Sequence, residues 1–454
     1  TEVVVARAQG LDQLGPVLPV HVGPVHCHGE EARRRRTQGS GGVGSLLDLQ
    51  EVTEVEAHPH PRAVELLGER QGRPVRLQPI ARVGIERHLH AGGLGQFVEL
   101  REDPEALRDL REFLRAQRID PFTFNAFPYG GFQEDGLKAR VYQPNWMEAE
   151  RVDYTVDVAW AAAGLVEASR DEPRMVSIST HPGAYGADIN DRSGLRRCAE
   201  GMGRALGEFV RIEDETGVRV VLSLESEPDA SARNGRALAE YLVFARLIAT
   251  RVLQDEFGVD VEAAGRLAAR HLGTCLDCCH SAVEFEAPED SLALATHGGP
   301  LGKVQVSSAL RLPAPAEHPE ARDELLAMDE PRFLHQVTAQ ADGTFLHLPD
   351  LPALSAALSE DESPWARAEE WRCHFHVPLD QATFGALATT RDHADRIVDA
   401  LLADPAAWST PELHLEIETY TWSILGDPGQ IVGGLEREYG HLTDRLGAAG
   451  WATR

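Results

Sequence analysis

The sequence predicts an α/β fold built around a (β/α)8 barrel, on the strength of two observations. From about residue 97 onward, short apolar strands alternate with amphipathic helices, which is the pattern of parallel βα units. Within the strands apolar and polar residues also alternate, so each strand has one apolar and one polar face. An open parallel sheet is covered by helices on both faces and needs two apolar faces. A barrel fits better, because its strand ends present polar side chains at the mouth.

The segment 219–227 shows the alternation clearly. Its apolar residues share one face, while Ser223, Glu225 and Glu227 share the other. An antiparallel sheet with one solvated face is the alternative explanation of this pattern. The helices between the strands favour the barrel.

Composition excludes several classes of function. The net charge of -28 over 454 residues argues against a nucleic-acid partner, since phosphate binding needs clustered basic side chains. No apolar run is long enough to insert into a membrane, and the first residues lack the pattern of a signal peptide. The six cysteines are not spaced like a disulfide framework. We therefore expect a cytoplasmic protein.

Residues 1–96 differ from the rest of the chain. They contain no Phe, Tyr or Trp, but hold seven of the nineteen histidines. A segment without large apolar side chains buries little apolar surface. The free energy gained by that burial is too small to offset the conformational entropy lost when the segment becomes ordered. We expect a disordered extension over 1–96 and a barrel domain over 97–454 that is incomplete at its N-terminus.

The barrel domain is expected to contain these elements in order. Helices are predicted at 104–117, 148–169, 194–216, 232–256, 390–403 and 428–446. Strands are predicted at 121–127, 174–180, 219–227, 271–277, 302–308, 371–377 and 412–419. The stretch 309–370 interrupts this rhythm with several prolines, and two apolar runs around Asp342-Gly343 predict a β-hairpin. We interpret 309–370 as an insertion between late barrel strands that forms a lid or a rim over the site.

Four strand ends carry side chains suited to a metal ion. Glu225, Asp277, Gln305 and Glu418 each end the polar face of a different predicted strand. Rigid strand ends can hold such ligands at the short distances that divalent ions require. Their recurrence predicts a site for one Mn, Mg, Co or Zn ion, although any one of them alone is more simply a solvated or salt-bridged carboxylate.

Several residues beside these ligands are candidates for catalysis. Glu227 lies two residues beyond Glu225 on the same face and suits a general base. His280 follows Asp277 by three residues, where it can bind the metal, orient a substrate or simply pack in the core. His374 and His376 share one strand face. They suit a pair of metal ligands or a proton-transfer site, and loop capping and packing are the alternative. We assign His376 to catalysis and His374 to substrate contact.

The substrate-binding candidates follow the earlier strands. Asn125 ends its strand and precedes an aromatic segment that includes Tyr129, while His181 faces inward after the strand 174–180. Aromatic rings of this kind suit the wall of a sugar site, and they equally suit loop packing. Lys303 can polarise a carbonyl or form a Schiff base, but a salt bridge to a neighbouring barrel carboxylate is the preferred interpretation.

Three cysteines near Asp277 raise a different metal site. Cys275, Cys278 and Cys279 include one CxxC spacing, which can bind structural zinc. The sequence has no second CxxC to complete such a site, so packing is the preferred interpretation.

The chain resembles a known family through several spaced motifs. FNAFPYGGF, VYQPNW, SLESEP, GTCLDCCHSAVEFE, GKVQVSSALRLP, FLHQV, HFHVPL and HLEIETYTW are similar to those of EboE metabolite-traffic proteins, a group of xylose-isomerase-like TIM barrels. The resemblance runs from about Phe97 to the end of the chain. It implies that Glu225, Asp277, Gln305 and Glu418 bind a divalent ion and that His280 is the histidine of a DxxH motif.

The resemblance fails at the N-terminus. Family members begin with a strand resembling CTNVHP and a second strand rich in Leu, Gly and Trp, and residues 1–96 contain neither. A reading-frame error or a misassigned start in the gene would explain this, and translation of the other frames upstream would test it.

Three functions are compatible with these observations. The first is a metal-dependent isomerase or epimerase acting on a small polyhydroxylated or carbonyl metabolite. The second is a non-enzymatic protein that binds the metabolite or other components of a membrane-associated secondary-metabolite transport system, as the resemblance implies. The third, a zinc phosphodiesterase acting on nucleic acid, is disfavoured by the charge of -28.

Overall fold

The structure is a computed structural model. It describes residues 2–5, 80–85, 100–129, 135–166, 168, 173–186, 191–297, 299–422 and 431–453. Among these residues, no helix combines the length and the apolar character that a membrane crossing requires. The description below concerns these ranges.

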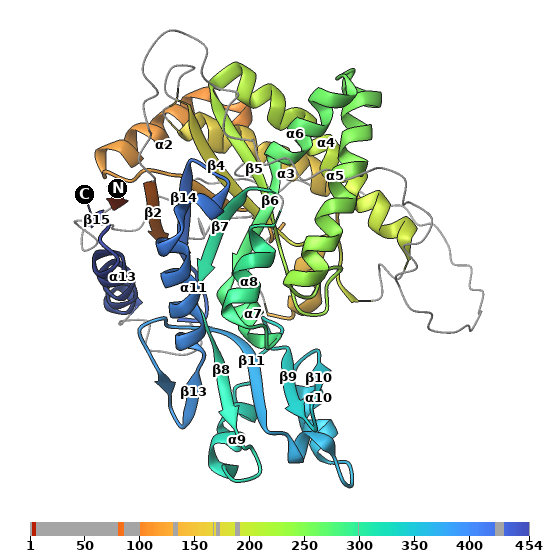
Figure 1. Cartoon of the computed structure of the whole chain (residues 1–454), viewed down its shortest axis with the longest axis vertical. Coiled ribbons are helices and arrows are strands. Elements are labelled where there is room, and N and C mark those ends of the chain that lie inside the picture. The colour runs from red at the N-terminus through yellow and green to blue at the C-terminus, as the bar shows by residue number, and fades with distance from the viewer. Residues whose placement is uncertain are drawn as a thin grey trace, which may run out of the picture. The chain divides into compact units, whose positions relative to one another are not determined.

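A parallel sheet forms the centre of the fold (Figure 1). Its strands, in chain order, are β1 (Glu2–Val5), β2 (Ile80–Ile85), β3 (Thr123–Asn125), β4 (Arg174–Thr180), β5 (Val218–Glu225), β6 (Leu272–Asp277), β7 (Leu301–Val306), β14 (Glu412–Ile417) and β15 (Ala452–Thr453). Their spatial order is β15-β1-β2-β14-β7-β6-β5-β4-β3. Every ladder in this sheet is parallel. Because parallel strands share one direction, their carboxyl ends meet at one edge.

The sheet curls into a nearly closed barrel. Lys303 on β7 donates from Nζ to Thr123 Oγ1 on β3 at 3.0 Å and to the Phe124 carbonyl at 3.1 Å. Thr123 also donates to Glu416 Oε2 on β14 at 3.3 Å. In the ladder order, β4, β5 and β6 separate β3 from β7. These contacts therefore cross the interior, and the predicted α/β barrel class is confirmed.

Helices connect and cover the strands. The α-helices are α2 (Pro104–Ala116), α3 (Ala149–Leu165), α4 (Arg192–Thr216), α5 (Gly235–Phe257), α6 (Val261–His271), α7 (Cys278–Val283), α8 (Pro288–Ala295), α9 (Pro319–Leu326), α10 (Leu351–Leu358), α11 (Arg391–Ala403) and α13 (Ile431–Ala448). Short 3-10 helices are η2 (Lys138–Tyr142), η4 (Pro364–Arg367) and η5 (Pro405–Trp408). The longest helices begin at side-chain caps and end at glycine: Asn234 caps α5 and Gly258 ends it at φ 70°. Helix α6 was not among the predicted elements.

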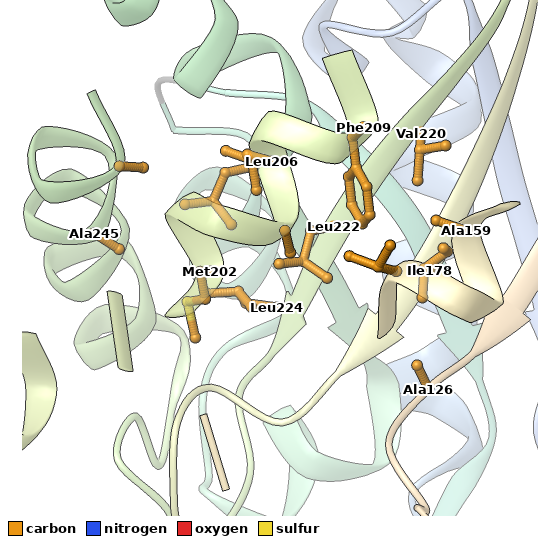
Figure 2. Packing of buried hydrophobic residues seen from close by; sticks show 14 of the residues in the cluster. Ala126, Ala159, Ile178, Met202, Leu206, Phe209, Val220, Leu222, Leu224 and Ala245 are labelled. Atoms are coloured by element: carbon orange, nitrogen blue, oxygen red, sulfur yellow. The ribbon is translucent and has the colours of Figure 1, made fainter. Parts of the chain in front are cut away.

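The core lies between α4 and the strands, as Figure 2 shows. Met202, Leu206 and Phe209 of α4 are fully buried with Leu222 and Leu224 of β5 in one cluster. These are the apolar strand positions that alternate with the polar ones. Packing them on α4 leaves the other face of β5 turned toward the barrel interior.

A second, antiparallel sheet follows β7. It consists of β8 (Ser308–Pro313), β9 (Val337–Ala341), β10 (Thr344–Leu348), β11 (Glu370–Val377), β12 (Thr383–Phe384) and β13 (Leu387–Thr389), in the order β10-β9-β11-β8-β13-β12. The predicted hairpin is confirmed as β9–β10, with Asp342 at φ 50° and Gly343 at φ 73° in its turn.

One predicted strand belongs to this second sheet and not to the barrel. The segment 371–377 was expected among the parallel strands, but β11 pairs antiparallel with both β8 and β9. Its alternating pattern suits an antiparallel strand equally well, because both kinds of strand place successive side chains on opposite faces. The expected extension over 1–96 contains β1 and β2, and the rest of it lies outside the described residues.

Candidate functional site

Three buried carboxylates meet at the carboxyl edge of the barrel. Glu225 is the last residue of β5, Asp277 is the last residue of β6, and Glu418 follows β14 directly. One oxygen from each of these side chains lies within 4.8 Å of the others. All three are nearly inaccessible to solvent. Burying an unpaired carboxylate charge has a high free-energy cost. A bound cation or protonation of the carboxylates is therefore expected to neutralise this group.

The local sequence explains the position of Asp277. It caps α7, accepting a hydrogen bond on Oδ1 from the His280 backbone N–H at 2.8 Å. This is the usual use of Asp before the first turn of a helix. The cap therefore fixes the carboxylate of Asp277 and places the His280 ring one turn farther along the chain. This explains the three-residue spacing of the DxxH motif.

The carboxylates shift one another's protonation. Burial raises the pKa of Glu225 well above its usual value, and repulsion from Asp277 and Glu227 adds to the effect against the pull of His280. Burial also acts to raise the pKa of Asp277, but the charges of His280 and His376 and the His280 N–H outweigh it and lower that pKa. Glu225 Oε2 has no hydrogen-bond partner among the described residues.

Gln305, the fourth predicted ligand, is engaged elsewhere. It lies on β7 in register with Asp277 on β6, and its Oε1 accepts a hydrogen bond from Cys275 Sγ at 2.9 Å. Its buried Nε2 has no hydrogen-bond partner in the described part of the chain. The structure thus brings three of the four predicted ligands into one group and places Gln305 in the strand between Asp277 and Glu418.

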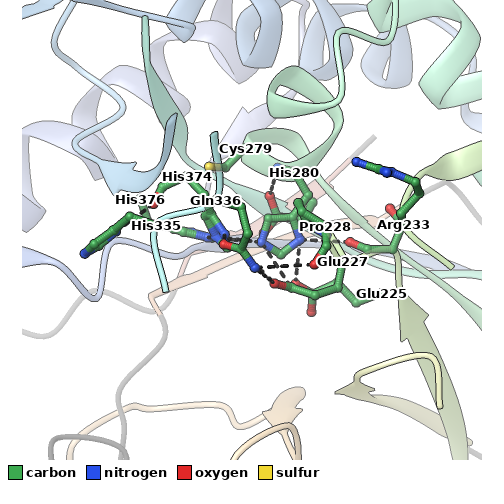
Figure 3. A network of polar contacts seen from close by, with 12 residues as sticks. Glu225, Glu227, Pro228, Arg233, Cys279, His280, His335, Gln336, His374 and His376 are labelled. Atoms are coloured by element: carbon green, nitrogen blue, oxygen red, sulfur yellow. Dashed lines mark hydrogen bonds and ion pairs between the residues drawn. The ribbon is translucent and has the colours of Figure 1, made fainter. Parts of the chain in front are cut away.

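Three imidazole rings, of His280, His374 and His376, meet beside the carboxylates; Figure 3 shows them with Glu225 and Glu227. His280 Nε2 lies 2.9 Å from His374 Nε2, and His374 Nε2 lies 2.9 Å from His376 Nε2. The remaining pair, His376 Nε2 and His280 Nε2, is 3.3 Å apart. His280 comes from the barrel and the other two from β11 of the antiparallel sheet. The two sheets therefore build this group jointly.

Glu227 lies on the same side of the barrel mouth. Its Oε1 accepts hydrogen bonds from Tyr142 Oη at 2.7 Å and from Gln336 Nε2 at 3.3 Å, while its Oε2 lies 3.4 Å from His280 Nε2. Burial raises the pKa of Glu227, although His280, Tyr142 and Gln336 act against it. A raised carboxylate pKa suits a group that exchanges protons near neutral pH.

His280 is held between carboxylates. Its Nδ1 lies 2.9 Å from the Ser226 carbonyl and 3.2 Å from Glu225 Oε1. Burial alone would lower the pKa of His280, but Asp277, Glu227 and Glu225 raise it to about 9. His374 differs, because burial and the neighbouring histidines lower its pKa well below the usual value.

These groups face a small cavity of about 60 Å³. Of the predicted site residues, those in its wall are Asn125, Glu225, Glu227, His280, His374, His376 and Glu418. Phe333, Leu334 and Gln336 of the insertion also contribute to the wall. The predicted lid role is therefore consistent with where the insertion lies.

Two predicted substrate-binding residues lie behind the wall. Tyr129 packs on Tyr154, with ring centroids 5.3 Å apart. His181 is fully buried against Phe127 and Tyr142, at centroid distances of 5.2 and 5.9 Å. Neither lines the cavity. Asn125 does line it, and its Oδ1 accepts from the Phe127 N–H at 2.8 Å.

Sequence reasoning missed several wall residues. Tyr142, Gln336 and Tyr420 all line the cavity, and the first two hold Glu227. Tyr142 lies in the VYQPNW motif on η2 and Gln336 in FLHQV. Neither lies on a strand whose alternation could have marked it, so the family motifs were the only available signal.

The cysteines do not form the alternative zinc knuckle among the described residues. Cys275 bonds to Gln305, Cys278 packs in an apolar cluster, and Cys279 lies near His374 and His376. Burial raises the pKa of all three thiols well above its usual value. They are therefore neutral at physiological pH in the absence of a metal.

Comparison with known proteins gives only distant likenesses. No protein-family model and no curated protein matches the sequence. Among solved structures, a D-tagatose 3-epimerase-like protein aligns with 82% of this chain and 89% of its own, at 12% identity and a TM-score of 0.37. The IOLI protein with a bound zinc atom aligns with 79% of this chain and 94% of its own, at 12% identity and a TM-score of 0.36. Likenesses of this size are too weak to identify the function of this chain.

Proposed function

We propose that this protein binds a divalent metal ion at the mouth of its barrel and isomerises or epimerises a small polyhydroxylated or carbonyl metabolite. The observation that carries the proposal is the meeting of Glu225, Asp277 and Glu418 from three separate strands. Their oxygens lie within 4.8 Å of one another. Three buried carboxylates at this separation repel strongly, and a divalent cation is the simplest group that stabilises all of them.

The residues present fit such an ion. Carboxylate oxygens suit Mn, Mg, Co or Zn, and Glu225 Oε2 has no hydrogen-bond partner among the described residues. Gln305 in the adjoining strand is the proposed fourth ligand, which requires its amide to leave Cys275. When bound, the ion would supply Lewis-acid polarisation of a substrate carbonyl.

The neighbouring side chains have separate proposed roles. Glu227 accepts a proton from the carbon beside the carbonyl, while Tyr142 and Gln336 hold one of its oxygens in place. His280 and His376 move protons on the substrate oxygens. The remaining predicted contacts, Asn125, Tyr129, His181 and His374, would position the substrate either directly or, for Tyr129 and His181, by supporting the wall.

The resemblance to EboE proteins suggests a finer role. On this basis the metabolite is an intermediate handled by a secondary-metabolite transport system, and other components of that system are the proposed partners. The small cavity of about 60 Å³ favours a compact polar metabolite over a large apolar one.

Metal analysis of the purified full-length chain tests the metal site. We expect Asp277→Asn and Glu225→Gln each to lower the affinity for Mn²⁺ by about 10-fold or more, because each removes a charged ligand. Glu262→Gln, which changes an exposed carboxylate on α6, is the matched control and should leave the affinity unchanged. Equal Mn²⁺ affinity in all four proteins would contradict the proposed site.

Hydrogen exchange tests the reaction. An isomerase or epimerase of this kind exchanges the carbon-bound hydrogen beside a carbonyl with solvent, so a panel of ketoses in D₂O should acquire deuterium. Metal binding without deuterium incorporation into any ligand that the protein binds would instead favour a non-enzymatic binding protein.

A further inference from the structure

The three imidazoles beside the carboxylates are arranged as ligands. The Nε2 atoms of His280, His374 and His376 form a triangle with sides of 2.9, 2.9 and 3.3 Å. Two imidazole nitrogens this close share a proton, share a cation, or face each other with their lone pairs. Which of these applies depends on where each ring carries its own proton.

The partners of the opposite nitrogens settle the tautomers of two rings. His280 Nδ1 faces two oxygens, the Ser226 carbonyl and Glu225 Oε1. The carbonyl oxygen can accept a hydrogen bond but cannot donate one, and the same holds for the ionised carboxylate of Glu225. His376 Nδ1 lies 3.1 Å from the Glu418 carbonyl and 2.9 Å from Ser307 Oγ. A carbonyl accepts, so each Nδ1 carries a hydrogen, and the neutral ring then has a lone pair on Nε2.

The third ring follows the same rule. His374 Nδ1 lies 2.6 Å from Gln336 Oε1. The orientation of this amide is fixed by its other end, because Gln336 Nε2 donates to Glu227 Oε1 and to the Pro228 carbonyl, both at 3.3 Å. Gln336 therefore presents an oxygen to His374, whose Nδ1 donates. In their neutral forms all three rings turn their Nε2 lone pairs toward one point, so an ion there takes the place of any proton on His280 Nε2.

We propose that His280, His374 and His376 bind a second divalent metal ion, of the zinc type, through these three Nε2 atoms. The site adjoins the carboxylate site, because Asp277 Oδ2 lies 4.0 Å from His280 Nε2. With this ion bound, His280 and His376 act as ligands and not in the proton transfer proposed above. Tetrahedral zinc with Zn–N distances near 2.0–2.1 Å holds its nitrogen ligands about 3.3 Å apart. The observed triangle is therefore close to the spacing that such an ion imposes.

The surroundings of the triangle complete the argument. Each histidine donates its second N–H to a carbonyl or amide oxygen, which is the support that histidine ligands of zinc usually have. The three rings line the cavity, and Glu227 Oε2 lies 3.4 Å from His280 Nε2. An ion held by the three rings would face the cavity, and Glu227 Oε2 would lie beside it.

A proton is the competing occupant of the triangle. One hydrogen on His280 Nε2 would bridge to His374 or to His376. It would still leave His374 and His376 with their Nε2 atoms 2.9 Å apart and no hydrogen between them. A single cation at the centre satisfies all three pairs, which is why the geometry favours a metal.

X-ray absorption at the zinc edge tests the proposal on the unaltered full-length protein. After removal of metals, filling of the carboxylate site with Mn²⁺ and addition of one equivalent of Zn²⁺, we expect the outer-shell scattering of about three imidazole rings. Zinc bound by oxygen ligands only, or no zinc bound, would overturn the proposal, and the second result would indicate the shared proton. This measurement needs no substitution, so a folding defect cannot confuse it.

Substitutions then separate the two sites. His374→Asn should remove about one equivalent of bound Zn²⁺ and the visible Co²⁺ absorption of a four-coordinate site, while leaving Mn²⁺ affinity unchanged. Asp277→Asn should do the opposite. His393→Gln, which changes a buried histidine bonded to Ser281, is the control and should retain both ions. Loss of one and the same ion in the Asp277 and His374 variants would overturn the separate site without removing the first.

Discussion

At the scale of single residues, Lys303 places a buried positive charge inside the barrel. It is fully buried and pairs with Glu416 Oε2 at 2.5 Å, while also binding Thr123 and the Phe124 carbonyl. The sequence predicted this salt bridge, because a lysine on the polar face of a barrel strand needs a carboxylate beside it. A buried ion pair adds little to the free energy of unfolding compared with an apolar pair of the same shape. Removing one partner, however, lowers that free energy strongly, because the other charge stays buried.

Lys303→Met should therefore lower the free energy of unfolding by about 3–5 kcal/mol, because it removes the buried positive charge that pairs with the Glu416 carboxylate. The double variant Lys303→Met/Glu416→Gln should recover part of this loss. Denaturant unfolding of the three proteins measures both effects. A single-variant loss below about 1 kcal/mol would mean that water reaches the pair.

Glu227 has the clearest catalytic prediction. Glu227→Gln keeps an oxygen for Tyr142 and Gln336 but removes the base, so exchange of substrate hydrogen with D₂O should fall about 10²- to 10⁴-fold. Mn²⁺ affinity should stay within a few-fold of the unaltered protein. Undiminished exchange would assign the base to another residue.

The residue scale also shows what sequence could reveal. Alternation along the strands identified Glu225 and Asp277, because a strand end in a barrel must present its polar face at the mouth. Tyr142 and Gln336 escaped notice, since η2 and the segment before β9 have no periodicity that reports orientation. The engagement of Gln305 by Cys275 is a tertiary contact that no local pattern encodes.

At the scale of elements, α4 packs closely against the backbone at Trp146. A Cβ on Gly201 would lie 2.4 Å from the Trp146 carbonyl oxygen, whereas a Cβ on Gly265 of α6 would meet nothing within 4 Å. The first glycine permits a close approach of two backbones. The second lies in a helix with open space beside it.

These glycines form a matched pair of substitutions. Gly201→Ala should destabilise the protein by about 1–3 kcal/mol through overpacking against backbone. Gly265→Ala should stabilise it by up to about 1 kcal/mol, because alanine has the higher helix propensity. Thermal unfolding of both variants compares them directly. Equal shifts of the same sign would show that α4 moves away from Trp146 freely.

The ionic contact between α4 and α6 makes the free energy of unfolding depend on pH. Glu213 of α4 bonds to Arg270 and lies 3.2 Å from His271 Nε2. Burial opposes ionisation of Glu213, but His271 and Arg270 together lower its pKa from 4.5 to about 2. The folded state therefore binds a proton less readily than the unfolded state, and the resulting stability is present above about pH 4.5 and lost as the pH falls toward 2.

Glu213→Gln should accordingly reduce stability at pH 7 by about 1–2 kcal/mol, a discounted figure because the group is partly exposed. The difference between the two proteins should shrink as the pH is lowered from 4.5 toward 2. Denaturant midpoints measured across this range would show it. A difference that is constant with pH would place the effect in packing and not in ionisation.

Strand assignment from sequence failed at one element for a physical reason. Parallel and antiparallel strands share a two-residue side-chain period, so the pattern of β11 could not report the direction of its neighbours. Only its pairing with β8 and β9 places His374 and His376 on the second sheet. The barrel strands β3 to β7 and β14 were predicted because helices separate them along the chain, whereas β1, β2 and β15 of the same sheet were not predicted.

At the scale of the whole molecule, the site joins two sheets of different kinds. The barrel supplies Glu225, Asp277 and Glu418, and the antiparallel sheet supplies His374 and His376. Ions bound to the folded state alone stabilise it in proportion to the logarithm of their concentration. Metal binding should therefore stabilise the contact between the sheets as well as the site.

The central claim is that the three strand-end carboxylates hold a metal ion. Diffraction from crystals grown with Mn²⁺, measured at the manganese edge, tests it most directly. We expect an anomalous peak within about 2.0–2.4 Å of oxygens from Glu225, Asp277 and Glu418. Saturating Mn²⁺ with no peak there, and carboxylates hydrogen-bonded to one another through shared protons, would contradict it.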